Sequence, residues 1–336
     1  MISRGINVVT VTFLFLLLVS AVQAHVPIIP NDNNNLETAT NIHDPLKSWA
    51  VYGQLGGEDA DYYRFDMEKG QKLHLMLFTP DKNTFTPGLA IMGPGITSQG
   101  TIPAFIDIPN GSGVIAVAGK RPDQASYEPF TPARIYERII IDMNVNADGT
   151  YYVAVFEPST EGRYGLAVGY REEFEVFEWI RVPLDVIAIH QWEGQSLGFI
   201  LAPMLVIIAI GFVFLIWQRE KRGYAPQSLS GWIASVAAFS YFGSSAMMFI
   251  QMGIALGHTD LPSSVIITVL LALLPIIAGI AMLYVSMKAM NGGEMKARVT
   301  MAILGIVGLF IWAGLLLGPV LAILASFLPS GTKEKT

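Results

Sequence analysis

The chain has 336 residues, of which 52% are hydrophobic and 14% are charged, and its formal net charge is −6. A soluble globular domain carries about 25% charged residues, so this composition indicates a membrane protein with only part of its length in water. The sequence contains no cysteine, which excludes thiolate metal sites, thiol nucleophiles, iron–sulfur clusters and disulfides.

Residues 1–24 are predicted to be a signal peptide. Arg4 supplies the positive charge of the n-region, and an apolar run of about 15 residues follows. Small residues suit signal peptidase at Ala24 and also at Ala21, so either bond could be cut, and an uncleaved anchor helix is the alternative. Cleavage after Ala24 would make His25 the first residue of the mature chain.

Residues 25–172 are predicted to form an extracytoplasmic β domain. Short segments rich in β-branched and aromatic residues are separated by Gly, Pro, Asn and Asp, and several alternate with period two, as Tyr63, Phe65 and Met67 do. Without a helical pattern among them, they predict an all-β antiparallel sandwich. The eight predicted strands are 48–55, 61–68, 72–80, 88–95, 113–119, 138–145, 150–158 and 163–171.

Two stretches of this region resemble one bacterial family. They are "EDADYYRFDMEKGQKLHLMLF" and "ADGTYYVAVFEPSTEGRYGLAVGY". Over about residues 48–171 the chain resembles the pre-peptidase C-terminal-type (PPC-like) domain, which implies a jelly-roll-like sandwich that accompanies secreted enzymes and surface proteins and is usually non-catalytic. The middle segment, 81–135, departs from the family pattern with Pro-rich loops, which form either a binding edge or simply ordered loops.

The segment 173–197 is predicted to be an interfacial aromatic linker. Bulky apolar side chains stand beside charged ones there, which is typical of the membrane interface. These side chains are Phe174, Phe177, Trp179, Ile180 and Trp192. The linker would seat the sandwich on the outer leaflet.

Four apolar runs follow and predict an α-helical four-span membrane bundle over 198–327. Each run exceeds the roughly 20 residues that a helix needs to cross the hydrocarbon layer. We recognise no family for this part. The predicted spans are 198–217, 229–257, 264–287 and 301–327.

Charged loops set the expected orientation. Two of the loops between spans are basic, and the loop between them, 258–263, has neither Lys nor Arg. The positive-inside rule places the basic loops in the cytoplasm, so the β domain and the tail 328–336 are expected outside the cell membrane. The basic residues are Arg219, Lys221, Arg222, Lys288, Lys296 and Arg298.

Two groups of residues are candidate metal ligands. A terminal His25 could chelate copper through its amine and imidazole nitrogens, with His43 or His74 completing the site, although a lone histidine after a signal peptide also arises by chance. An acidic loop offers oxygen ligands to calcium but lacks the full ligand spacing of a calcium loop, and a solvated turn is the alternative. Its residues are Glu58, Asp59 and Asp61.

The sequence carries no hydrolase motif and no ATP-binding loop, so no catalytic or cofactor-binding residue is predicted. Nucleic acid is excluded as a partner because residues 25–195 hold 23 acidic against 12 basic side chains. The most polar predicted span contains Gln251, the candidate for a polar intramembrane site, although a packed bundle explains it as well. Asn110 stands in a glycosylation triplet.

These observations favour a non-enzymatic integral membrane protein that presents an acidic β-sandwich to a ligand, protein or glycan outside the cell, in contact with the lipid bilayer. It could be an oligomer or a subunit of a larger complex. One alternative is a copper-handling protein that uses His25. A third hypothesis is a small-molecule channel or transporter.

Overall fold

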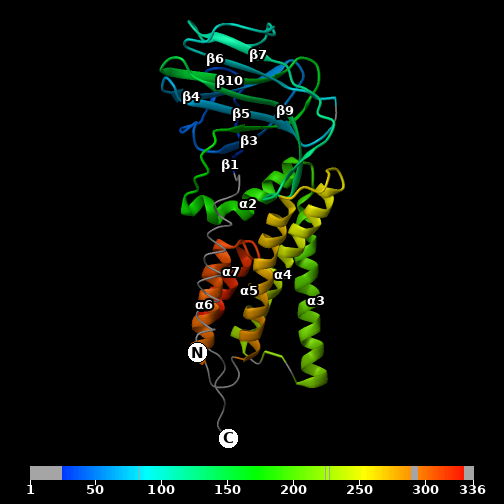
Figure 1. Ribbon diagram of the computed structural model, residues 1–336. Coiled ribbons are helices and arrows are strands. Elements are labelled where there is room, and N and C mark those ends of the chain that lie inside the picture. Colours follow the sequence, from blue (N-terminus) through cyan, green and yellow to red (C-terminus); the bar gives the residue numbers. More distant parts are fainter. Residues whose placement is uncertain (1–24, 83, 224, 227, 289–293, 329–336) are drawn as a thin grey trace. The chain divides into compact units, whose positions relative to one another are not determined.

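The computed structural model describes residues 25–82, 84–223, 225–226, 228–288 and 294–328. They divide into two compact units (Figure 1). The β unit holds the described residues up to Asp123 together with Ile135–Glu173, and the helical unit holds Gln124–Arg134 and the described residues from Phe174 onward. The predicted signal peptide and tail residues 329–336 lie outside the described residues.

The β unit consists of two layered sheets (Figure 1). The six-stranded sheet has the order β1-β3-β11-β5-β9-β8, and the five-stranded sheet has the order β2-β4-β10-β6-β7. The strands are β1 (Val26–Ile28), β2 (Thr40–Asn41), β3 (Trp49–Leu55), β4 (Asp59–Met67), β5 (Lys72–Thr79), β6 (Gly88–Gly93), β7 (Gly113–Val117), β8 (Ser126–Glu128), β9 (Ala133–Asn144), β10 (Gly149–Glu157) and β11 (Gly162–Val168).

The sheets are mixed, which corrects the prediction of a purely antiparallel sandwich. β1 pairs with β3 in parallel, and β2 pairs with β4 in parallel. These two strands have three and two residues and show no periodicity in the sequence. The other ladders are antiparallel, and each of the eight predicted strands has a counterpart among them.

The alternation read from the sequence sets the core between the sheets. Tyr63, Phe65 and Met67 of β4 face Leu73 and Leu75 of β5 in one buried cluster. A second, smaller cluster forms where Tyr62, on the opposite face of β4, packs with Ile106 and its neighbours from the 94–112 loop. Burial on both faces of β4 explains why Tyr62 is buried on a face that the alternation predicted to be polar.

In the helical unit, three helices are long and apolar enough to cross a membrane by length and composition, and they match the first three predicted spans. They are α3 (Leu197–Arg222), α4 (Leu229–Leu256) and α5 (Val265–Lys288). Ahead of them, the predicted linker forms a helix, α2 (Val176–Trp192), whose first turn is closed by the Glu178 carboxylate accepting from the Glu175 N–H at 2.8 Å.

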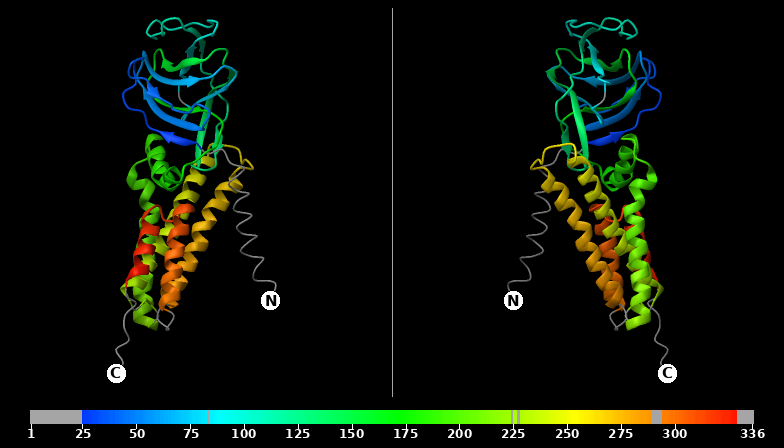
Figure 2. Two further views of the ribbon diagram at one scale, coloured as in Figure 1. Left: turned by 90° about the vertical axis from the view of Figure 1, so that its left-hand side faces the viewer. Right: turned by 90° about the vertical axis from the view of Figure 1, so that its right-hand side faces the viewer.

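The fourth predicted span is not a single helix. It divides into α6 (Glu294–Phe310) and α7 (Leu317–Phe327), which lie side by side and run in opposite directions (Figure 2). Between them, Trp312, Gly314 and Leu315 all have positive φ, which ends the helix and reverses the chain. The Arg298 guanidinium donates to the Ser326 carbonyl at 2.7 Å, which ties the end of α7 to the beginning of α6.

The segment Gln124–Arg134 contains the edge strand β8 and the first two residues of β9, but by its contacts it groups with the helical unit. The Tyr127 hydroxyl lies 2.7 Å from the Thr268 hydroxyl of α5, and that hydroxyl donates to the Pro129 carbonyl at 2.6 Å. Phe130 meets Trp312 edge to face, with ring centroids 6.5 Å apart. The predicted loop region 81–135 therefore contains an ordered segment that belongs to the helices.

Candidate functional site

Two of the three candidate copper ligands, His25 and His74, belong to the same sheet, next to β1 and on β5, with β3 and β11 between those strands. His25, just before β1, has its Nδ1 2.5 Å from the Ser48 hydroxyl, and His74 on β5 has its Nδ1 2.9 Å from an Asp142 oxygen. Burial lowers the pKa of His25 to about 4, and the nearby His74 acts in the same direction. His25 is therefore neutral at pH 7, which is the form that binds metals.

His43 has different contacts from those of His25 and His74. It is exposed, and its Nδ1 lies 3.1 Å from the Asn41 side-chain amide. Among the described residues, no group of three or more His, Asp or Glu side chains is arranged to hold a metal ion. A copper site would therefore need the terminal amine of a cleaved chain as a further ligand.

The three acidic-loop residues point to different partners. Glu58 sits in a turn with φ of 56°, and Asp59 accepts from the Ala60 N–H. Asp61 is buried inside the β unit, where it accepts from the Tyr164 hydroxyl at 2.5 Å. The Tyr164 hydroxyl is also 2.5 Å from that of Tyr63.

This buried carboxyl has an unusual protonation equilibrium. Burial raises the pKa of Asp61 to about 6, the Tyr164 hydrogen bond opposes the rise, and the charges of Asp59 and Asp32 add to it. Burial also raises the pKa of both Tyr63 and Tyr164, so both hydroxyls stay protonated and can donate. The arrangement is an internal polar network that joins β4 to β11, rather than an exposed cation site.

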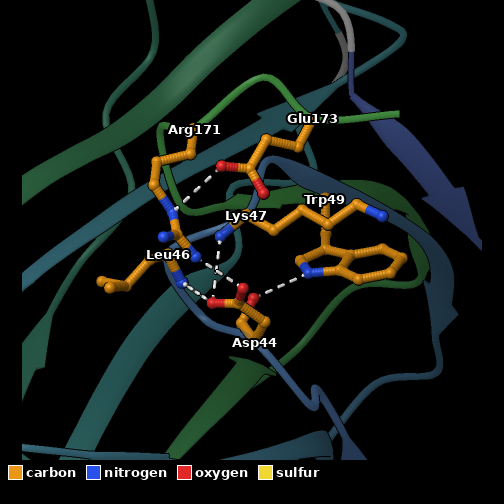
Figure 3. Close-up of polar contacts among 6 residues, drawn as sticks. All are labelled: Asp44, Leu46, Lys47, Trp49, Arg171 and Glu173. Atoms are coloured by element: carbon orange, nitrogen blue, oxygen red, sulfur yellow. Dashed lines mark hydrogen bonds and ion pairs between the residues drawn. The ribbon is translucent and has the colours of Figure 1, made fainter. Parts of the chain in front are cut away.

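A cluster around Asp44, which the sequence analysis did not single out, joins the beginning and the end of the β unit (Figure 3). The Arg171 guanidinium contacts the Asp44 carboxylate at 2.6 Å and the Glu173 carboxylate at 3.8 Å. The other Asp44 oxygen accepts from the Leu46 N–H at 3.0 Å, and the Trp49 indole donates to the Asp44 carbonyl at 2.8 Å. The sequence signal for this turn was Asp44 followed by Pro45, because an Asp carboxylate commonly accepts a hydrogen bond from the backbone N–H two residues later.

The same cluster contains a cation–π contact. The Lys47 ammonium lies 4.6 Å from the centroid of the Trp49 ring. The Arg171 N–H and C=O also take part, because its N–H donates to the Leu46 carbonyl and its carbonyl accepts from the Ser48 N–H at 2.8 Å each. These contacts fix the direction in which the chain leaves β11, so the cluster has a positioning role.

Gln251, the candidate for a polar membrane site, is buried in α4 and paired with Gln195. The two side-chain amides donate to each other, at 2.8 and 2.6 Å. Gln195 also approaches Glu193, whose carboxylate accepts from Nδ1 of His190 at 2.7 Å. Sequence reasoning placed His190 and Glu193 in a linker, and their i,i+3 spacing at the end of a helix was the signal that could have joined them.

Asn110 lies at an exposed tip of the 94–112 loop. The Ser112 N–H donates to the Pro109 carbonyl at 3.1 Å, and Gly111 has φ of 79°, which describes a tight turn with Asn110 at its second position. The Asp107 N–H donates to the buried Tyr62 hydroxyl at 2.8 Å, which holds the loop on the sheet. The loop is therefore held in place, and this agrees with both readings of the middle segment, a binding edge or simply ordered loops.

No protein-family description matches the chain, and no curated protein matches it. Three solved structures are similar to part of it. They are periplasmic inhibitors of g-type lysozyme, called PliG, from Salmonella Typhimurium (17% identity, 40% of this chain, 100% of that chain, TM-score 0.24), Escherichia coli (17%, 40%, 99%, 0.24) and Aeromonas hydrophila (13%, 43%, 99%, 0.23). At these TM-scores the likeness carries no conclusion about fold or function, and the PPC-like resemblance stays a prediction.

Proposed function

We propose that this chain is a non-enzymatic integral membrane protein whose β unit binds a partner protein or glycan outside the cell. The observation that carries the proposal is the tip of the 94–112 loop. It is held to β4 through Tyr62, yet it exposes Ile108, 41% accessible, between Asp107 and Pro109. An ordered loop with an apolar side chain at a polar rim loses little conformational entropy on binding.

A cross-linking experiment tests this surface. The native chain has no cysteine, so Ile108→Cys can be labelled alone with a photoreactive maleimide in intact cells. The matched control is Ile140→Cys, another exposed isoleucine, 55% accessible, on β9 of the other sheet. We expect a specific adduct from position 108 and none from position 140. Equal yields, or no adduct at either position, would contradict the proposed surface, and robust turnover of an extracellular substrate by the purified protein would contradict the whole assignment.

The proposal includes an orientation for the helical unit. Arg219 and Arg222 lie at one end of α3. The Tyr127–Thr268 contact holds the Gln124–Arg134 segment near the beginning of α5, which follows the loop 257–264. That loop contains Asp260 and neither Lys nor Arg. The positive-inside rule then puts the arginine end in the cytoplasm and that segment outside. Three apolar helices of 23 to 28 residues support the membrane anchor.

The α6–α7 hairpin changes the expectation for the tail. An outside tail followed from a single fourth span, but the hairpin returns Phe327 to the end where Arg298 lies, at 3.0 Å between the guanidinium and the carbonyl. We therefore propose a cytoplasmic tail. Single-cysteine labelling should give Leu328→Cys the accessibility of Glu220→Cys and not that of Asp260→Cys, and the opposite pattern would restore the four-span arrangement.

A second candidate function, copper binding, is favoured by the placement of His25 and His74 in one sheet, where the charge of His74 adds to the lowering of the His25 pKa. Coordination through Nδ1 of His25 would replace its hydrogen bond to Ser48. N-terminal sequencing must first place His25 at the mature start. Copper(II) affinity should then fall in both His25→Ala and His74→Ala but not in His43→Ala. Unchanged affinity in the first two variants, or a mature start at Val22, would remove this function.

A further inference from the structure

The helical unit contains a small cavity of about 60 Å³ where α2, α3 and α4 meet the turn between α6 and α7. Most of its lining is apolar, and the Gln124–Arg134 segment contributes Phe130 and Pro132 to it. Its other apolar residues include Met247, Met248 and Trp312, and its polar residues are His190, Ser244 and Gln251.

Two of these polar side chains are already hydrogen-bonded to other groups of the protein. Gln251 exchanges both ends of its amide with Gln195. The Ser244 hydroxyl donates to the Tyr241 carbonyl at 2.9 Å and accepts from the Gly314 N–H at 2.8 Å. Ser244 is therefore engaged with the backbone and is not hydrogen-bonded to His190, which argues for binding rather than nucleophilic chemistry.

His190 is the polar lining residue that can still accept a hydrogen bond. It is 2% exposed, and its Nδ1 lies 2.7 Å from Glu193 Oε2. An ionised carboxylate only accepts, so Nδ1 carries the proton in this pair. In the neutral ring Nε2 is then an acceptor, and no described residue donates a hydrogen bond to it. Nε2 is not among the fully buried atoms that lack a partner, so it keeps some accessible surface, and a hydroxyl of a ligand could donate to it.

We propose that this cavity binds the hydroxyl end of a neutral amphiphile, with the hydroxyl donating to Nε2 of His190 and the adjoining carbons packing on Met247 and Trp312. A single water needs about 10–15 Å³ of such volume, so 60 Å³ holds a hydroxyl and a few carbons, and the rest of the chain must extend from the opening. A charged head group does not fit, because the lining offers no Lys or Arg and burying an unpaired charge is costly. This site does not depend on the outer partner proposed above.

Bromine quenching of Trp312 tests the site in the full-length protein in lipid nanodiscs. The probe is 11-bromoundecan-1-ol, and 1-bromoundecane is the matched molecule without the hydroxyl. We expect saturable quenching by the alcohol that exceeds quenching by the bromoalkane, and loss of the saturable part in Trp312→Phe identifies the reporter. Equal quenching by the two molecules, or quenching that rises linearly as for simple partitioning, overturns the proposal.

Two variants separate recognition from packing. His190→Leu removes the acceptor and should weaken the alcohol about tenfold, the effect of one hydrogen bond to a buried group. Val186→Phe fills the cavity from α2, one helical turn before His190, while leaving the His190 and Glu193 side chains unaltered, and it should abolish the saturable quenching. Leu184→Phe, on the exposed side of α2, is its control and should bind normally. Unchanged binding in both His190→Leu and Val186→Phe overturns the proposal.

The source of the amphiphile is distinguished by a second probe. 6-Bromohexan-1-ol added from water carries the same hydroxyl on a chain that partitions weakly into the bilayer. Saturable quenching by this probe supports a water-borne alcohol, whereas saturable quenching by the undecanol alone supports a lipid-borne one. Saturable quenching by neither contradicts the site.

Discussion

The two units differ in the size of the side chains that they bury. The β unit buries large residues, and Arg138, Tyr63, Tyr151 and Tyr164 are among its largest fully buried side chains. The helical unit buries many small ones beside Tyr241 and two methionines, and its main cluster contains Ala234, Ala237, Ala238, Ala322 and Ala325. In water, large apolar area drives burial, whereas helices in lipid gain little from it and depend on close approach.

The polar groups follow the same division. In the β unit they join distant strands, as Arg138 does by donating to the Thr79 hydroxyl at 2.9 Å and to the Asp81 carbonyl at 3.0 Å. In α4 several serines instead donate to carbonyls of their own helix, as Ser240 does to Ala237 at 2.7 Å. The first pattern specifies long-range pairing, and the second satisfies hydroxyls so that helices can pack closely.

The largest expected effect is at the contact between α7 and α4. A Cβ on Gly318 would overlap Ser240 and Tyr241 of α4, so Gly318→Val should separate the hairpin from α4 and destabilise the helical unit by about 3 kcal/mol or more. The control is Gly253→Val, also within the helical unit, where a Cβ meets nothing within 4 Å. Thermal unfolding in detergent measures both, and equal melting temperatures would show that close packing is not what holds the hairpin.

The second effect is a pH dependence in the β unit. The folded protein keeps the Asp61 proton up to about pH 6, whereas the unfolded chain releases it near 3.8. The free energy of unfolding should therefore fall by about 3 kcal/mol in total between about pH 3 and pH 7, with about 2 kcal/mol of that between pH 4 and pH 6, and it should stay lower at neutral pH. Asp61→Asn, which keeps an acceptor for Tyr164, should flatten this dependence.

Hydrogen exchange of the β4 and β11 amides in the full-length protein, between pH 4 and 7 and corrected for intrinsic rates, measures that dependence. The control is Asp142→Asn, because hydrogen bonds from Lys72 and His74 lower the pKa of the exposed Asp142 carboxyl and give it the opposite sign. A native slope that persists in Asp61→Asn would assign the pH dependence to other groups.

A smaller effect is expected at the base of the hairpin. Arg298→Met keeps the length of the side chain but removes its donors to the Ser326 and Phe327 carbonyls. The end of α7 should fray, at a cost of about 1–2 kcal/mol. Faster hydrogen exchange confined to the last turn of α7 would confirm it, and Lys296→Met, two positions earlier, is the matched charge control.

The smallest effect is expected at the Asp44–Arg171 pair. The two side chains are 42% and 41% exposed, and ion pairs of this kind contribute about 0–1 kcal/mol. Arg171→Met should therefore change the melting temperature of the β unit very little, and the change should shrink further in high salt. A large loss that salt does not reduce would mean that Arg171 acts through packing instead.

The sequence was sufficient where one physical rule dominates. The alternation of Tyr63, Phe65 and Met67 predicted the inner face of β4, and apolar length predicted α3, α4 and α5 within a few residues. β1 and β2 escaped because two or three residues carry no period. Length alone also predicted the fourth span wrongly, since the break comes from Trp312, Gly314 and Leu315 at positive φ, a conformation that glycine favours but that Trp and Leu do not signal.

The site residues show the same limit. His25 and His74 were singled out by chemistry, and their placement in one sheet follows from strand order, which local patterns do not contain. Gln251 was identified by its polarity in an apolar run, but its partner Gln195 precedes α3 by only two residues and looked like part of a linker. Asp61 appeared to be a solvent-facing loop residue because its partner, the Tyr164 hydroxyl, is far away in sequence.

The packing of Gln124–Arg134 with the helices affects how the β unit can be produced as a separate fragment. A soluble fragment ending at Glu173 would retain Tyr127 and Phe130 without Thr268 and Trp312, the residues that receive them. Those aromatic rings would face water and promote self-association. Replacing 124–134 by a short polar connection would be the prerequisite for crystallising the sandwich alone, and a full-length sample would remain necessary for any biophysics in which the native hairpin matters.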